Sequence, residues 1–324
     1  MIKKAIFILL TAALVCAPIG LAELYLRYLG LGDPILFYAN ASYRYAPLPN
    51  QQKQRLHDAR VTIDSKGLRS SRDWSQRADA KILFIGDSVT WGGTFIDDAD
   101  TFADGVCQRL AQATGKTFVC GNAGANQYGT DNLAERIRYK DFDDETAIVV
   151  TLISPDTIRG LTDAAGGFFL TARPPAPFRA LWEAAAFLAW RSYRFLRPLS
   201  YRQTDDLRVA ERSLQNLLDA IRETQRPGRT VLLVLSPVAT ELGGHETALT
   251  RRVQEILGRS GLELLDLHDA VTAALTSDFY YDAIHLDVRG HHFYADAIAA
   301  RLAPALGRRL GANVEYASPP SRQP

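Results

Sequence analysis

From residue 81 onward, short apolar segments alternate with longer amphipathic ones. The apolar segments are nearly continuous in Val, Ile, Leu and Phe and occupy residues 81–86, 117–120, 147–153, 230–238 and 262–267. Continuous apolar runs of this length are typical of strands that helices cover on both faces. The pattern therefore predicts a three-layer α/β/α domain built on a mainly parallel five-stranded sheet.

The segments between these strands show helical periodicity. The clearest apolar stripe consists of Leu207, Ala210, Leu214, Leu217, Leu218 and Ile221. A second one, Ala295, Ile298, Leu302 and Leu306, predicts a last helix over about residues 289–310. Residues 176–203, rich in aromatic side chains and arginine, interrupt the alternation and predict a helical insertion. It either packs on the domain with a solvated arginine face or rests on a membrane, an acidic glycan or lipid headgroups.

The N-terminus carries an uncharged apolar segment, residues 5–22, directly after Lys3 and Lys4. As a helix it would be roughly 27 Å long, close to the ~30 Å thickness of a bilayer core. We therefore expect a transmembrane anchor over residues 1–30, with the body outside the cytoplasm in the periplasm or at the cell surface. A signal peptide cleaved after Ala22 is the alternative.

The remaining segments lack clear periodicity. Residues 31–78 are rich in Pro, Asn, Gln, Ser and Arg and predict an irregular arm, and residues 313–324 predict a flexible tail. The main domain is therefore expected over residues 79–312.

Composition excludes several classes of function. Lys plus Arg total 37 against 36 Asp plus Glu, so the chain lacks the basic excess of a nucleic-acid binder. The six histidines and three cysteines show no metal-ligand spacing, so we expect no metal and no cofactor. Cys107 and Cys120 are expected to be buried free thiols, with a disulfide as the alternative that an oxidising compartment would allow.

Two short motifs carry the candidate chemistry. Gly86-Asp87-Ser88 ends the first predicted strand, where an α/β fold exposes a nucleophile on a sharp turn, although Thr90 breaks the GxSxG pattern. Near the C-terminus, Asp282 precedes His285 by three residues, close enough to hold its Nδ1 proton and turn Nε2 toward a serine. The other candidate bases, His57, His245 and His268, are expected to be surface residues.

These two motifs resemble the nucleophile block and the last block of the SGNH hydrolases, also called the GDSL esterase/lipase superfamily. The resemblance covers about residues 79–310, and the predicted anchor and arm look like those of membrane-tethered members. It implies that Ser88 is the nucleophile, His285 the general base and then acid, and Asp282 the residue that orients His285.

In its two middle blocks, this sequence departs from the pattern of the family. The resemblance places the oxyanion-hole glycine at Gln127, and the expected oxyanion donors are Ser88, Gln127, Gly124 and Asn122. The asparagine donor of the third block falls at Pro155, which has neither a side-chain amide nor a backbone N–H.

By the same resemblance, the expected activity is that of a serine esterase that removes O-acyl groups from an extracytoplasmic carbohydrate or a small ester. Two alternatives remain: an O-acyltransferase on cell-surface polysaccharide that uses the same triad, and a weakly active glycan-binding descendant of the fold. The sequence predicts no oligomeric state.

Overall fold

The computed structural model describes residues 2–163, 170–196, 203–274 and 277–312, so the expected tail lies outside the described residues. Its centre is a five-stranded sheet in the order β6-β5-β7-β8-β9, with every neighbouring pair parallel. The strands are β5 (Ala80–Ile85), β6 (Phe118–Asn122), β7 (Ala147–Leu152), β8 (Thr230–Leu235) and β9 (Glu263–Asp266). The predicted parallel five-stranded sheet is confirmed, and its order reverses beside β5, where sheets of this kind bind ligands.

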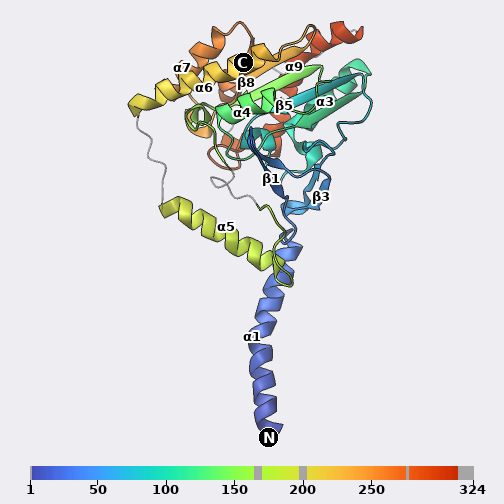
Figure 1. Cartoon of the computed structure of the whole chain (residues 1–324), viewed down its shortest axis with the longest axis vertical. Coiled ribbons are helices and arrows are strands. Elements are labelled where there is room, and N and C mark those ends of the chain that lie inside the picture. Colours follow the sequence, from blue (N-terminus) through green and yellow to red (C-terminus); the bar gives the residue numbers. More distant parts are fainter. Residues whose placement is uncertain (1, 164–169, 197–202, 275–276, 313–324) are drawn as a thin grey trace.

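Helices cover both faces of this sheet (Figure 1). One face carries α3 (Phe102–Thr114), α8 (His268–Ala273) and α9 (Val288–Leu310), and the other carries α4 (Thr130–Arg138), α6 (Gln203–Glu223) and α7 (Ala248–Gly258). Successive strand residues alternate between the two cores: Ile82 and Phe84 pack with α3 and α9, whereas Leu83 and Ile85 pack on the opposite side. The three-layer architecture is therefore confirmed.

The predicted irregular arm contains two antiparallel hairpins, which corrects the expectation from sequence. The first pairs β1 (Phe37–Asn40) with β2 (Arg44–Pro47), and the second pairs β3 (Gln51–Gln54) with β4 (Arg60–Ile63). The sequence conceals these strands because each is only four residues long and β3 is entirely polar. Tyr45, Val61 and Trp74 are nevertheless fully buried in the core, so the arm is part of the folded domain.

The N-terminal helix α1 (Ile2–Tyr28) projects from the body as a rod, with the N-terminus at its far end (Figure 1). Across the part of the chain that the structure describes, no helix is long and apolar enough to cross a membrane. The expected transmembrane anchor is therefore not confirmed.

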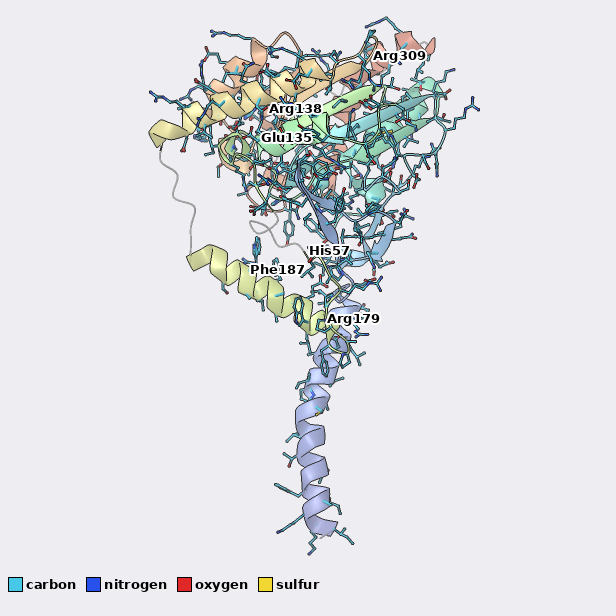
Figure 2. All side chains as sticks on the ribbon, viewed as in Figure 1. His57, Glu135, Arg138, Arg179, Phe187 and Arg309 are labelled. Atoms are coloured by element: carbon cyan, nitrogen blue, oxygen red, sulfur yellow. A yellow bond between two sulfur atoms is a disulfide. The ribbon has the colours of Figure 1, made fainter. Side chains whose placement is uncertain are left out.

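The predicted insertion forms α5 (Arg179–Leu196), which docks on α1 and the arm rather than over the sheet (Figure 1). The carboxylate of Glu23 on α1 accepts hydrogen bonds from the N–H groups of Ala180 and Leu181, and Glu183 pairs with Arg55 of the arm. Figure 2 shows Arg179 and Phe187 on this helix, away from the helices of the sheet. The side chains of Arg194, Arg197 and Arg202, which contribute to the predicted arginine face, lie outside the described residues.

Cys107 of α3 and Cys120 of β6 form a disulfide with their Cα atoms 5.9 Å apart. The expectation of free thiols was wrong because α3 runs back along the strand that follows it, which brings the two positions within bridging distance.

Candidate active site

Ser88 is held at the start of a short helix, α2 (Ser88–Trp91), immediately beyond the carboxyl end of β5. Asp87 is buried, and its Oδ1 accepts a hydrogen bond of 2.8 Å from the N–H of Val89, which caps α2. A Cβ atom at Gly86 would lie 1.9 Å from Oγ1 of Thr90, so the turn requires glycine at this position. The Gly86-Asp87-Ser88 motif is therefore a compact turn that presents the serine at the edge of the sheet.

The structure brings Ser88, His285 and Asp282 together. Oγ of Ser88 lies 2.9 Å from Nε2 of His285, and Nδ1 of His285 lies 2.8 Å from Oδ2 of Asp282. The other carboxylate oxygen of Asp282 accepts the N–H groups of Ile284 and His285, each at 2.8 Å. These backbone bonds orient the carboxylate toward the imidazole, as the spacing of the motif predicts.

The charge of Asp282 sets the tautomer of His285. Partial burial works to raise the pKa of Asp282, but hydrogen bonds from His285 and Ile284 outweigh it, so this pKa lies below its ordinary value. An ionised Asp282 only accepts hydrogen bonds, so Nδ1 of His285 carries the proton between them. Nε2 then has a free lone pair that accepts the hydroxyl proton of Ser88.

The loop that carries Asp282 and His285 is fastened to the loop after β8. The N–H of Ala239 donates to the carbonyl of Ala283 at 2.9 Å, and the hydroxyl of Tyr280 donates to the carbonyl of Pro237 at 2.8 Å. These bonds hold the base at the carboxyl edge of the sheet, opposite Ser88.

His268 is buried, contrary to the expectation that it is a surface residue, whereas His57 and His245 are exposed. Its Nδ1 lies 2.6 Å from Asp266 and its Nε2 lies 3.4 Å from Glu241. Burial would lower the pKa of His268, but these two carboxylates raise it to about 9. The three side chains form an ion-pair cluster, and no group of three or more His, Cys, Asp or Glu among the described residues is arranged to hold a metal ion.

Two of the four expected oxyanion donors are already engaged. The side-chain amide of Asn122 donates to the carbonyl of Thr90 at 2.5 Å, and its Oδ1 accepts the N–H of Gly124 at 2.9 Å. Asn122 therefore stabilises the end of α2 and accepts the hydrogen bond that the N–H of Gly124 could have given to an oxyanion. Within the described residues, the N–H groups of Ser88 and Gln127 donate to no acceptor.

Gln127 occupies a backbone conformation that favours glycine. Its φ is 67°, in the left-handed region that residues with a Cβ rarely adopt. The side-chain Oε1 of Gln127 accepts a hydrogen bond of 2.9 Å from Arg159, and its carbonyl accepts one of 2.7 Å from Thr162. These contacts compensate for the strain and keep the side chain tied to Arg159.

Pro155 lies in the 3₁₀ helix Ser154–Ile158 that follows β7, so this position supplies no N–H and no amide. The next residue, Asp156, is fully buried. Burial and the neighbouring charge of Asp87 raise the pKa of Asp156 well above its ordinary value, although Arg159 opposes them. Asp156 therefore lies beside Asp87, beneath the nucleophile turn, and pairs with Arg159.

Arg69, a residue of the arm, is a structural support of the site that sequence reasoning missed. Its guanidinium donates to the carbonyls of Trp91 at 2.7 Å and Gly93 at 2.6 Å, and also to the carbonyl of Ile96. Its backbone pairs with that of Asn122 at the edge of β6. Arg69 thus holds the loop that follows Ser88, and no motif in the sequence signals this role.

No family model and no curated protein matches the sequence. Among solved structures, the chain is similar to a lipase/acylhydrolase from Enterococcus faecalis, with 16% identity, 74% of this chain and 100% of that chain covered, and a TM-score of 0.44. It is also similar to a variant of an acetyl xylan esterase from Geobacillus stearothermophilus, with 16% identity, 74% and 97% covered, and a TM-score of 0.43. An acetyl xylan esterase from Butyrivibrio proteoclasticus shows 13% identity, 72% and 66% covered, and a TM-score of 0.42.

The turn at Ser88 and the Asp282–His285 loop are those implied by the sequence resemblance. In its fold and in this arrangement the chain resembles the SGNH hydrolases.

Proposed function

We propose that the protein is a serine esterase that hydrolyses carboxylic esters through an acyl-Ser88 intermediate. The observation that carries this proposal is the continuous hydrogen-bonded chain from Ser88 Oγ through both nitrogens of His285 to Asp282, at 2.9 and 2.8 Å. A serine is a weak nucleophile unless a base removes its proton, and this arrangement supplies the base and fixes its tautomer.

The reaction proceeds in two halves. Oγ of Ser88 attacks the ester carbonyl carbon while its proton moves to Nε2 of His285, which gives a tetrahedral oxyanion. When this intermediate collapses, the bond to the alcohol oxygen breaks and that oxygen takes the proton from Nε2. Water then attacks the acyl-serine carbonyl carbon and gives a proton to Nε2. When this second tetrahedral intermediate collapses, the bond between the acyl carbon and Oγ of Ser88 breaks, Oγ takes the proton from Nε2, and the acid leaves.

We assign the oxyanion contacts to the N–H groups of Ser88 and Gln127. Both belong to turns at the carboxyl edge of the sheet, and neither donates to another acceptor in the described part of the chain. Pro155 stands at the position where the third block of the family has an asparagine donor, and it supplies no donor itself. Because loss of one such donor typically reduces turnover by about 10²–10³, we expect slower catalysis than a complete oxyanion hole would give.

The openness of the site favours hydrolysis over acyl transfer. The side chains of His285 and Asp282 are 35% and 47% exposed, so water reaches the base directly. An acyltransferase has to keep water away from its acyl-enzyme, which this geometry does not do.

An extracytoplasmic location is also part of the proposal. The Cys107–Cys120 disulfide supports it, because such bonds persist in oxidising compartments and are rare in the cytosol. A reporter that is active only after export, fused after residue 40, should be active. Activity of a reporter that works only in the cytoplasm would contradict this location.

Covalent labelling with a fluorophosphonate probe tests the proposed activity. The probe needs an activated serine but not the natural substrate, so wild-type protein should be labelled, and Ser88→Ala and His285→Ala should abolish labelling. Ser75→Ala and His245→Ala, at exposed positions outside the site, serve as matched controls and should be labelled normally. Folded wild-type protein that resists the probe, or labelling that survives Ser88→Ala, would refute the proposal.

A further inference from the structure

The turn after β6 presents the N–H of Gln127, one of the two N–H groups that we assign to the oxyanion. The φ of Gln127 is 67°, a left-handed conformation that glycine adopts readily and that residues with a Cβ avoid. The turn is therefore strained at the residue that has to donate the hydrogen bond, and the direction of this N–H depends on contacts with the surrounding segments.

The peptide unit that carries this N–H is held by Tyr45 of the arm. The hydroxyl of Tyr45, which is a fully buried residue, donates to the carbonyl of Asn126 at 2.7 Å. A trans peptide unit is planar, so the carbonyl of Asn126 and the N–H of Gln127 point in opposite directions. The bond from Tyr45 therefore fixes the direction of the N–H, which points away from Tyr45.

The segment after β7 holds the rest of Gln127. Nη1 of Arg159 donates to the side-chain Oε1 of Gln127 at 2.9 Å, and the hydroxyl of Thr162 donates to its carbonyl at 2.7 Å. Together with the bond from Tyr45, these contacts engage the side chain of Gln127 and the carbonyl on each side of its Cα atom. Its N–H donates to no acceptor in the described part of the chain, so it is held in one direction and is available to a substrate.

The guanidinium of Arg159 also connects this turn to the nucleophile turn. Its Nε pairs with the carboxylate of Asp156, and Asp156 lies beside Asp87. Oδ1 of Asp87 accepts the N–H of Val89 at 2.8 Å, which caps the helix that begins at Ser88. The side chains of Arg159 and Asp156 are 15% and 6% exposed, so solvent screens their ion pair little. Arg159 thus links the two turns that carry the proposed oxyanion donors.

We propose that Arg159 is a positioning residue for the reaction: by tying the side chain of Gln127 to Asp156, it aims the N–H of Gln127 at the carbonyl oxygen of the ester. This inference rests on the proposed esterase function and adds to it the residue that keeps an oxyanion donor in place. Pro155 leaves the segment after β7 without a donor of its own, but through Arg159 this segment supports the donor on the neighbouring turn.

Arg159→Met tests the proposal, because it removes the charge and both contacts but keeps a long side chain in place. Both halves of the reaction pass through an oxyanion, whereas the bound ester carries no such charge. For 4-nitrophenyl acetate, kcat should therefore fall about tenfold while KM changes little. Arg159→Lys keeps the charge and should recover part of the loss. A wild-type kcat for folded Arg159→Met protein would overturn the proposal.

The same substitution in Gln127→Gly protein separates positioning from a merely structural role. Glycine adopts a φ of 67° without support and has no side chain for Arg159 to hold. In this background Arg159→Met should lower kcat by less than about twofold, because the effects of two residues that act through one contact are not additive. An equal loss of kcat in both backgrounds would contradict the proposal, since Arg159 would then affect catalysis without Gln127.

Urea-induced unfolding shows whether Arg159→Met protein is folded. If it is not, Gln127→Ala tests the same contact, because it removes the hydrogen bond to Arg159 and leaves the ion pair of Arg159 with Asp156 in place. The kcat of Gln127→Ala should fall about tenfold as well. A kcat for this variant equal to that of wild-type protein would show that the contact positions nothing.

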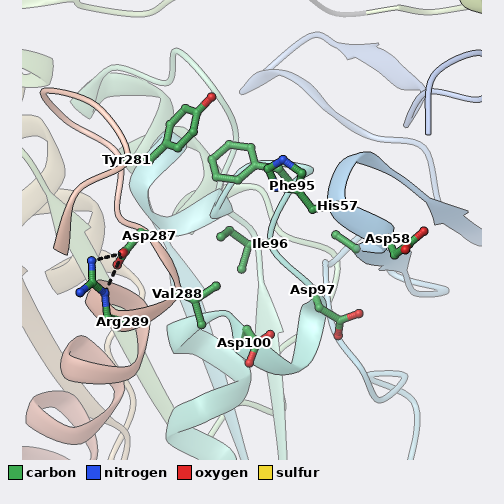
Figure 3. Close-up of a pocket in the computed structure, with 11 residues that line it drawn as sticks. His57, Asp58, Phe95, Ile96, Asp97, Asp100, Tyr281, Asp287, Val288 and Arg289 are labelled. Carbon is green, nitrogen blue, oxygen red and sulfur yellow. Dashed lines mark hydrogen bonds and ion pairs between the residues drawn. The ribbon is translucent and has the colours of Figure 1, made fainter. Parts of the chain in front are cut away.

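Two other arginines provide matched controls. Arg138 is the last residue of α4, at the far end of this helix from the Gln127 turn, and its side chain is 19% exposed and pairs with Glu223 at 2.7 Å (Figure 2). Arg289 lines a pocket of about 630 Å³ between the arm, the loop after α2 and the start of α9, and pairs there with Asp287 at 3.1 Å (Figure 3). Arg138→Met and Arg289→Met should both keep kcat near the wild-type value. If either loses as much kcat as Arg159→Met, the loss of any ion pair suffices and the proposal fails.

Failure of the positioning role and failure of the proposed function give different results. If the aryl ester is hydrolysed and Arg159→Met leaves kcat unchanged, the positioning role is refuted and the esterase stands. If wild-type protein neither hydrolyses the ester nor reacts with the fluorophosphonate probe, the proposed function is refuted, and the positioning role with it.

A third result, labelling of Ser88 without hydrolysis of the aryl ester, makes the rate of labelling the measurement. Oγ of Ser88 then displaces fluoride from phosphorus, the hydroxyl proton moves to Nε2 of His285, and the phosphoryl oxygen takes the place of the oxyanion. Arg159→Met should slow this labelling about tenfold, and an unchanged rate would refute the positioning role.

Discussion

The guanidinium of Arg69 and the carboxylate of Asp98 form an ion pair of 2.9 Å in which both side chains are buried. The same carboxylate accepts the N–H of Thr62 at 2.7 Å, so the pair joins the second hairpin of the arm to the loop after Ser88. The arm thus supports both the proposed nucleophile and one wall of the pocket.

We expect Arg69→Ala to destabilise the protein by about 3–5 kcal/mol, because it leaves the buried carboxylate of Asp98 without its partner. Urea-induced unfolding measures this change. Arg60→Ala is the matched control: its ion pair with Asp97 is longer, at 3.7 Å, and half exposed, so the loss should be at most about 1 kcal/mol. Similar losses for the two variants would contradict the support that we assign to Arg69.

Asp282→Asn should lower kcat for an aryl ester by about 10³–10⁴ while the protein remains folded, because the amide no longer enforces the Nδ1–H tautomer of His285. Asp278→Asn alters an exposed carboxylate shortly before it in the chain and should leave kcat near the wild-type value. A wild-type kcat for Asp282→Asn would show that this residue does not orient the base.

Pro155→Asn should raise kcat by up to about 10², because it restores both a backbone N–H and an amide side chain at the position of the missing oxyanion donor. Pro155→Ala restores the backbone N–H alone and separates the two contributions. If the asparagine variant is no faster than the alanine variant, the amide side chain does not reach the oxyanion.

His268 should make the stability of the protein fall at alkaline pH. Its pKa in the folded state, about 9, lies above the ordinary value of 6.5, so its stabilising effect is complete below the ordinary value and is lost as the pH rises through 9. Urea unfolding at about pH 6 and about pH 10 measures this loss. The free energy of unfolding should decrease less between these two pH values for His268→Gln than for wild-type protein. Equal decreases in the free energy of unfolding for the two proteins would show that His268 does not cause the loss of stability at alkaline pH.

Alkylation of the denatured protein without reductant, followed by intact-mass measurement, should label Cys16 but neither Cys107 nor Cys120. The exposed Cys16 is the internal control for the reagent. Replacing both bridged cysteines with serine should cost about 3 kcal/mol of stability, as expected for a short closed loop. Labelling of all three cysteines would show that the bridge is absent.

The parallel sheet and two of the helices that cover it, α6 and α9, were predictable from local sequence patterns. Continuous apolar runs and 3.6-residue stripes are local patterns, and burial on one face or both imposes them directly. The juxtaposition of Ser88 with Asp282 and His285 was also predictable, because the two motifs resemble the nucleophile block and the last block of the SGNH hydrolases.

The structure of the segments between these elements was not predictable from local patterns. The strands of the arm are too short and polar to show a period, and the role of Arg69 depends on carbonyl groups, which every residue possesses. The Cys107–Cys120 bridge, the burial of His268 and the engagement of Asn122 and Gly124 depend on distances between distant segments. Such distances are set when the layers pack, because side chains adapt to neighbours that the local sequence does not specify.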